Sequence, residues 1–93
     1  MTFFHGTSSA LHIKKWILPP VYTQVKREHW RSKYNDKVFF TNSVLSARKF
    51  ARKACEKYGG EPLVYIVKPV GVWFKTINTE YIADKALVVG KVE

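Results

Sequence analysis

Near the amino terminus, His5-Gly6-Thr7 combines residue types that can contact a sugar or nucleotide. A histidine at the end of a strand can hydrogen-bond a hydroxyl through either ring nitrogen. A glycine beside it lets a ligand approach the backbone, where a Cβ would block it. The tripeptide is short, and a plain turn next to a hydrogen-bonded histidine would give the same letters. It is therefore a candidate ligand site that needs support from elsewhere in the chain.

Aromatic side chains supply the second candidate, Phe39-Phe40-Thr41, together with Phe50 further along the chain. On a strand, Phe39 and Phe40 point to opposite faces, so only one of them can face a given ligand. Two aromatic faces can sandwich a cationic ring such as a pyridinium and gain cation–π attraction. The competing interpretation is that all three phenylalanines belong to the hydrophobic core.

The third candidate is a carboxylate, Glu80, at the start of a β-branched and aromatic segment. Glutamate is poorly suited to strands, so its presence there in a basic chain suggests a chemical role. A surface ion pair is the ordinary alternative, and Asp84 is the rival acid for any catalytic role.

The elements expected to position these residues alternate between strands and helices. Strands are expected at Thr2–His5, Lys37–Thr41, Pro62–Val67, Val72–Lys75, Glu80–Ala83 and Ala86–Val92, with a turn at Gly6. A short helix from Thr7–Ser9 through Lys15 should stop before Pro19-Pro20. Apolar residues at helical spacing predict the main helix over Ser43–Tyr58, ended by Gly59-Gly60. Pro20–Asp36 is expected to be a long surface loop or a marginal helix. The order predicts a single α+β domain over residues 1–93 with a mostly antiparallel sheet.

Charge is strongly unbalanced, with sixteen Lys and Arg against seven acids and a net charge of +9. Such a surplus attracts anions, including nucleotides, nucleic acids and acidic protein surfaces. The cations concentrate in Lys26–Lys33 and Arg48–Lys57. With Trp30 and Tyr34 as stacking platforms, these stretches would also suit a basic nucleic-acid-binding module without catalysis.

Other compositional features exclude several classes of protein. The single cysteine, Cys55, excludes an internal disulfide, and no set of Cys and His matches a structural zinc site. No apolar stretch approaches the ~20 residues needed to span a bilayer. The amino terminus lacks the pattern of a signal peptide. We therefore expect no metal, no membrane insertion and a cytoplasmic protein.

Five segments, taken in order, resemble the ADP-ribosyltransferase superfamily, in its diphtheria-toxin-like and rifamycin-modifying branches. Phe4-His5-Gly6-Thr7 resembles the Tyr-His-Gly-Thr motif, and Val38-Phe-Phe-Thr41 resembles the aromatic–Ser/Thr strand. Val64–Gly71 and Ala86–Val92 are similar to two strands of the rifamycin-modifying enzymes. Thr79-Glu-Tyr-Ile82 resembles the strand that carries the catalytic glutamate. Each motif is short, but the ordered set covers nearly the whole chain.

The resemblance implies a small split-sheet fold, with one main and one short helix, that binds NAD as its substrate. It implies that Glu80 stabilises positive charge on the ribose and that His5 holds the adenosine-side ribose. Phe40 and Phe50 would clamp the nicotinamide ring, while Arg27 and Arg31 would contact the pyrophosphate or the acceptor. The implied NAD-binding set is His5, Gly6, Thr7, Phe39, Phe40, Thr41 and Phe50.

Two positions depart from the family pattern. The place of the family tyrosine is taken by Phe40, or by Phe39 in the rifamycin-type alignment, which keeps the stacking face but not the phenol; Phe50 or Tyr58 would supply the second aromatic wall. Arginine-modifying members carry Glu or Gln two residues before the catalytic glutamate, where this chain has Asn78. The resemblance thus argues against an arginine acceptor.

The acceptor itself is left open by the sequence. A chain this short has little room for an acceptor-recognition domain, which favours a macromolecule of acidic character, a protein or a nucleic acid. A small molecule such as an antibiotic remains an alternative. With water as the acceptor, the protein would be an NAD glycohydrolase. A non-catalytic binding module on the same fold is a further alternative, and roles as a phage effector, a toxin or an anti-defence protein are all compatible.

Overall fold

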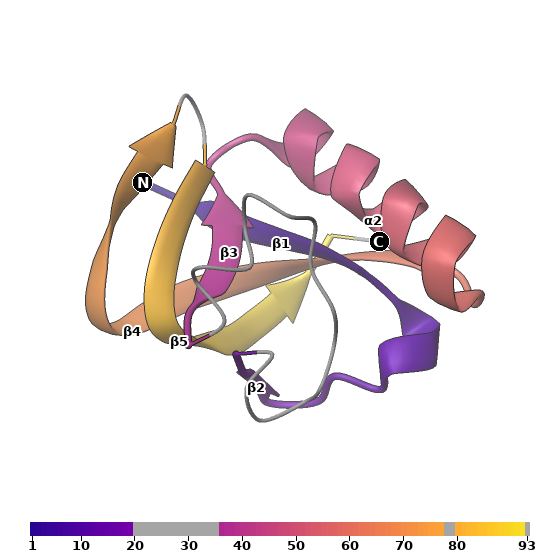
Figure 1. Cartoon of the computed structure of the whole chain (residues 1–93), viewed down its shortest axis with the longest axis horizontal. Helices are drawn as coiled ribbons and strands as arrows, with labels where there is room; N and C mark the ends of the chain where they lie inside the picture. The colour runs from indigo at the N-terminus through magenta and orange to yellow at the C-terminus, as the bar shows by residue number, and fades with distance from the viewer. Residues whose placement is uncertain (20–35, 78–79, 93) are drawn as a thin grey trace.

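Five strands and one α-helix organise the parts of the chain that the computed structural model describes, residues 1–19, 36–77 and 80–92 (Figure 1). In chain order they are β1 (Phe3–Ser8), the 3₁₀-helix η1 (Ser9–Leu11), β2 (Trp16–Ile17), β3 (Val38–Thr41), α2 (Val44–Tyr58), β4 (Pro62–Ile77) and β5 (Glu80–Lys91). All strand pairs are antiparallel. The α+β class and the antiparallel sheet expected from the sequence are therefore confirmed.

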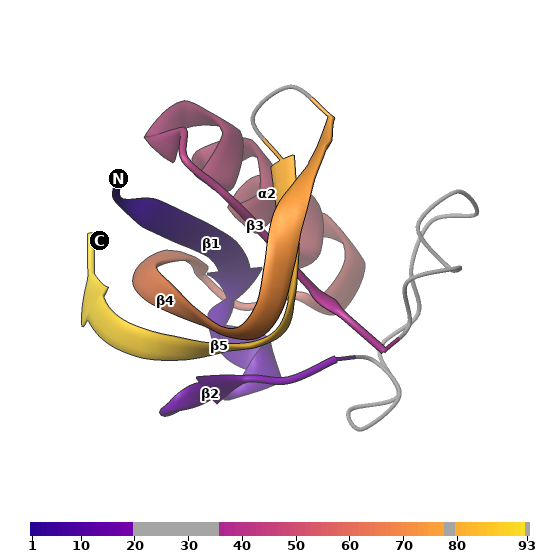
Figure 2. The same ribbon diagram turned by 90° about the vertical axis from the view of Figure 1, so that its left-hand side faces the viewer.

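The sheet closes into a small barrel because its two long strands, β4 and β5, pair with each other as well as with the shorter strands. The strand order is β2-β5-β3-β1-β4, and β4 pairs again with β5 to complete the ring. Strands β4 and β5 bend together around β1 and β3 (Figure 2). Register shifts interrupt the β4–β5 ladder at three places, Ile66/Val67, Val70/Trp73 and Lys75/Ile77. Such bulges increase the local bend and twist of a strand pair, which allows a short sheet to close.

Helix α2 covers one side of this barrel and is fixed at both ends by local sequence signals. The Ser43 side chain accepts a hydrogen bond from the Ser46 amide at 3.2 Å, as expected for an N-cap. Gly59 and Gly60 both have positive φ values, which end the helix. The sequence-based helix boundaries are thus confirmed to within one residue.

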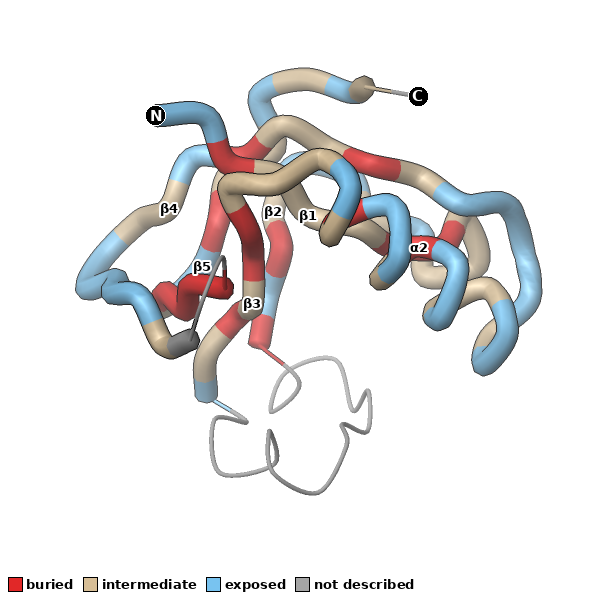
Figure 3. The backbone as a smooth tube through the Cα atoms, turned by 90° about the horizontal axis from the view of Figure 1, so that it is seen from above, coloured by how far each residue is buried: buried red, intermediate tan, exposed pale blue. Residues whose placement is uncertain are grey.

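Two hydrophobic clusters hold the layers together. The larger one fills the barrel and is built on the rings of Phe3, Phe40 and Tyr81, whose centroids lie 4.9–5.6 Å apart. The smaller one joins Ala47 and Ala51 of α2 to the sheet. Figure 3 shows buried stretches of β3 and β5 near the centre and exposed outer turns of α2 at the side.

Several expected element boundaries are wrong, each for a physical reason. Pro69 and Gly71 do not split β4, and the Asp84-Lys85 pair does not split β5, because the sheet absorbs these residues as bends and register shifts. The expected turn at Gly6 lies inside β1, which continues to Ser8. The short helix ends at Leu11, where His12 adopts a left-handed backbone.

An ion pair between Lys37 and Asp84 lies at the bend of the β4–β5 hairpin. The Lys37 ammonium lies 2.6 Å from Asp84 Oδ1, and the Val72 amide donates to Asp84 Oδ2 at 2.9 Å. The Lys37 partner and the Val72 amide hold the pKa of Asp84 below its usual value. The Asp84 carboxylate in turn raises the pKa of Lys37. Asp84 therefore has a structural role.

This ion pair predicts a pH dependence of folding stability. Because the pKa of folded Asp84 lies below the ordinary 3.8, its contribution is complete above pH 3.8 and is lost as the pH falls below that value. Thermal unfolding followed by circular dichroism should therefore show a smaller acid-induced fall for Asp84→Asn than for the wild type, since asparagine can still accept from Val72. Equal falls below pH 3.8 would contradict this role.

Candidate active site

A gap in the sheet creates the candidate site. Strands β1 and β3 pair only at Phe4 and Thr41, after which they diverge. Strands β3 and β2 pair with successive segments of β5, at residues 80–83 and 86–87. The rest of β1 therefore lies apart from β2 and β3, and a pocket of about 1160 Å³ opens between them beside the carboxyl-terminal half of α2.

All seven residues expected to bind NAD line this pocket. They come from β1, from β3 and from α2, three elements far apart in the sequence. Their meeting in one place could not be derived from the strand and helix pattern alone. The set is His5, Gly6, Thr7, Phe39, Phe40, Thr41 and Phe50.

His5 lies where the β1–β3 ladder stops, and its side chain connects the two strands. Its Nδ1 is 2.7 Å from the carbonyl oxygen of Phe39. Because a carbonyl can only accept, Nδ1 carries a proton and donates it to this carbonyl. The bond fixes the imidazole of His5 in the lining of the pocket.

Gly6 has a packing role in addition to its place in the pocket. A Cβ at this position would overlap the carbonyl oxygen of Ala47 and lie 2.8 Å from the Ala51 nitrogen. Helix α2 therefore packs directly on the backbone of β1. In the structure, glycine is required at position 6 because helix α2 approaches β1 closely, not because a ligand does.

The two phenylalanines of β3 have different surroundings, as strand alternation predicts. Phe40 is 3 % exposed, lies edge-on to Phe3 and stacks on Tyr81, so its ring belongs to the core. Phe39 is half-buried and points to the opposite face. The ring arrangement therefore favours Phe39, with Phe50 of α2, over Phe40 as the aromatic wall of the pocket.

Glu80 lies one strand away from the pocket lining. It begins β5, is 6 % exposed and pairs across the strands with Thr41, which does line the pocket. Directly opposed residues in an antiparallel pair have Cβ atoms about 5 Å apart. The Glu80 side chain, on the neighbouring strand β5, would therefore lie close to a ligand that contacts Thr41. One carboxylate oxygen of Glu80 is shielded from solvent.

Phe74 is a candidate that the sequence did not single out. Phe39, Ile82 and Phe74 are paired in one row across β3, β5 and β4. This row lies on the same face as Glu80, which is two residues before Ile82. Phe74 is 47 % exposed and is not among the residues that line the pocket.

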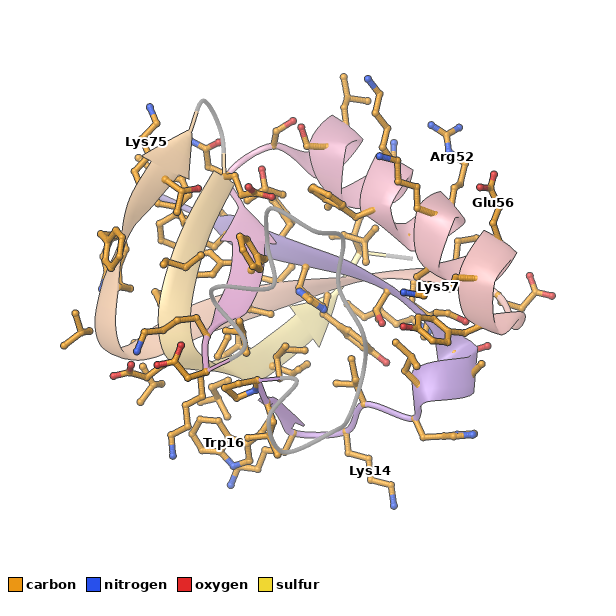
Figure 4. All side chains as sticks on the ribbon, in the orientation of Figure 1. Lys14, Trp16, Arg52, Glu56, Lys57 and Lys75 are labelled. Atoms are coloured by element: carbon orange, nitrogen blue, oxygen red, sulfur yellow. The ribbon has the colours of Figure 1, made fainter. Side chains whose placement is uncertain are left out.

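Four lysines at the pocket were also missed as a group. They line it from two sides, with Lys14 and Lys15 before β2 and Lys53 and Lys57 on α2; Glu56 is the one acid among the described lining residues. Figure 4 shows Lys57 on the side of α2 that faces the pocket region and Lys14 across from it. Their sequence signal was only a general excess of charge, since their convergence depends on the tertiary fold.

Some of the predicted positions lie outside the described residues. These are Arg27 and Arg31, the basic stretch Lys26–Lys33 with Trp30, and Tyr34 and Asn78. Among the described residues, no group of three or more His, Cys, Asp or Glu is arranged to hold a metal ion. None of the helices within these ranges is long and apolar enough to cross a membrane.

Comparison with known protein families and curated sequences shows no relationship. No protein-family model matches the chain, and no curated protein sequence is significantly similar to it. Functional assignment therefore depends on the geometry and chemistry of the pocket and on the ordered motifs of the sequence.

Proposed function

We propose that this chain is an NAD-dependent ADP-ribosyltransferase that cleaves NAD in the pocket between β1, β3 and α2. The observation that carries the proposal is the convergence of all seven expected NAD-binding residues on that pocket, with Glu80 opposite Thr41 on the neighbouring strand. The divergence of β1 from β3 supports the finer assignment of the barrel to the split-sheet fold of this superfamily.

The chemistry of the pocket fits the parts of NAD. Its volume of about 1160 Å³ is slightly above the ~300–1,000 Å³ typical of small-molecule sites. Aromatic rings from Phe39 and Phe50 suit the cationic nicotinamide, and an imidazole such as that of His5 can hydrogen-bond a ribose hydroxyl. The lysines on both sides suit the pyrophosphate.

The bond that breaks determines the role of the carboxylate. When the bond between nicotinamide and C1′ of the ribose breaks, its electron pair leaves with neutral nicotinamide, and positive charge develops on the sugar. A fixed carboxylate near that sugar stabilises the charge, more strongly in a site of low polarity. Glu80 is assigned this role. A nucleophile of the acceptor then bonds to C1′ and loses its proton, which completes the transfer.

The pyrophosphate assignment predicts an effect on binding. Lys53→Gln/Lys57→Gln should weaken NAD binding about tenfold in isothermal titration calorimetry, because hydrogen bonds to charged groups contribute about 1.5–3 kcal/mol before solvent screening. Binding of ADP-ribose should weaken equally, and binding of nicotinamide alone should not change.

The matched control removes the same charge outside the pocket. Lys68→Gln/Lys91→Gln alters two exposed lysines of β4 and β5, neither of which lines the pocket. It should leave NAD affinity within about twofold of the wild type, since screened distant charges contribute little. Equal losses in both variants would show a general charge effect and contradict the pyrophosphate site.

A further inference from the structure

Helix α2 carries a dense cluster of basic side chains. Five of the chain's sixteen Lys and Arg lie on this helix of 15 residues, against one acid, Glu56. All five are exposed, and Figure 4 shows Arg52 projecting away from the sheet. We call this set the α2 basic face; it consists of Arg48, Lys49, Arg52, Lys53 and Lys57.

This arrangement works against the stability of the helix itself. Arg48–Arg52, Lys49–Lys53 and Lys53–Lys57 are like-charged pairs at a spacing of four residues, which destabilise helices. The first turn carries no acid, although the helix dipole favours acids there. Neither feature contributes to folding, so the charge pattern points to a partner of opposite charge.

The face has a regular spacing and continues into the pocket. Residues four apart on a helix are separated by about 6 Å along its axis, so the cations from Arg48 to Lys57 extend over about 14 Å. Lys53 and Lys57 belong both to this face and to the pocket lining. A polyanion that follows α2 would therefore arrive at the pocket mouth.

Two aromatic rings of the pocket lining indicate what kind of polyanion fits. Trp16 and Tyr58 line the pocket and are half-buried, with Lys85 4.3 Å from the Trp16 ring centroid and Lys57 5.3 Å from that of Tyr58. Cations that track a backbone, combined with aromatic faces for bases, are the features of single-stranded nucleic-acid binding. An acidic protein surface would use the cations but would not need the rings.

We propose that the α2 basic face binds the phosphates of a single-stranded nucleic acid and brings one of its nucleotides to the pocket as the acceptor. Binding by this face is independent of the proposed NAD chemistry. Only the acceptor role depends on that function.

The test measures fluorescence anisotropy of a fluorescein-labelled, mixed-sequence single-stranded DNA of about 20 nucleotides, between about 50 and 200 mM salt. Each neutralised phosphate contributes about −0.7 to the slope of log affinity against log salt concentration. Arg48→Gln/Lys49→Gln/Arg52→Gln, which leaves the pocket-lining residues intact, should therefore bind more weakly, with a slope shallower by about 2.

Two comparisons make this outcome specific. Lys68→Gln/Lys75→Gln/Lys91→Gln removes the same charge from β4 and β5 and should leave the slope nearly unchanged. Poly-glutamate at equal charge concentration should displace the DNA poorly. Failure of the wild type to bind, equal losses in both triple variants, or efficient displacement by poly-glutamate would overturn the proposal; the last would indicate an acidic protein partner.

Folding and activity are checked separately. Circular dichroism should show the helical content of the wild type, because glutamine is a good helix former. If the triple variant does not fold, Lys49→Gln/Arg52→Gln should still make the slope shallower by more than about one unit, since two contacts are removed. NAD cleavage by the α2 variant without nucleic acid should equal that of the wild type, so loss of DNA binding with retained cleavage separates this proposal from the proposed function.

Discussion

Glu80→Gln should reduce the release of nicotinamide from NAD by at least about 100-fold while leaving NAD affinity within about threefold. Loss of one preorganised charge-stabilising group typically lowers a rate by about 10²–10³-fold. Glutamine keeps the shape of the side chain opposite Thr41 but not its charge. The measurement is nicotinamide release by chromatography, with NAD binding by calorimetry and thermal unfolding to confirm the fold.

Asp84→Asn is the matched control, because Asp84 is the other acid of β5. Its carboxylate is held by Lys37 and the Val72 amide at the hairpin bend. We therefore expect Asp84→Asn to cleave NAD at the wild-type rate and to differ from the wild type only in how its folding stability responds to acid. If Asp84→Asn lost turnover and Glu80→Gln kept it, the two acids would have to exchange roles.

Gly6→Ala should destabilise the protein by about 3 kcal/mol or more, which is large for one methyl group. The new Cβ would meet the backbone of α2 at Ala47 and Ala51, which cannot move without shifting the helix. For a domain of this size we expect the melting temperature to fall by more than about 12 °C. Chemical denaturation followed by fluorescence would measure the loss.

Gly59→Ala is the control for this prediction, because no atom lies within 4 Å of the Cβ it would introduce. Only its backbone conformation opposes alanine, because φ of 78° with ψ of −165° is almost exclusive to glycine, and we expect a loss of about 1–3 kcal/mol. If Gly6→Ala were as stable as Gly59→Ala but failed to bind NAD, ligand approach rather than helix packing would be the requirement at Gly6.

Local features of the fold followed from the sequence. The glycines after Tyr58 and the apolar residues at helical spacing before them predicted α2 almost to the residue. The alternation of Phe39 and Phe40 between two faces followed from strand geometry. These features depend on residues close in the chain, which is why sequence patterns carry them.

Features that depend on distant pairings did not follow from the sequence. Pro69 and Gly71 have the composition of a turn, but pairing with β5 keeps β4 continuous through them. Strand β2 has only two residues, and its pairing with Leu87 and Ala86 leaves no local pattern. In the same way, no local signal places Lys14 and Lys15 across the pocket from Lys53 and Lys57.

The candidate site, too, could be predicted from the sequence only in part. The ordered motifs identified the seven pocket residues, but not that Phe40 is packed in the barrel core or that His5 Nδ1 donates to Phe39. The position of Glu80 opposite Thr41 results from the β3–β5 register. Register depends on the closure of the whole sheet, so the sequence named the residues but not their arrangement.

To test NAD-dependent ADP-ribose transfer, the purified wild-type chain is incubated with NAD labelled in the nicotinamide ring. The reaction is run with and without cell lysate or single-stranded nucleic acid, and released nicotinamide is measured. The account predicts release that increases when an acceptor is supplied, together with transfer of the ADP-ribose to that acceptor. Equal release without any acceptor would indicate an NAD glycohydrolase in the same pocket. No release under any of these conditions, together with no detectable binding of NAD, would contradict the account.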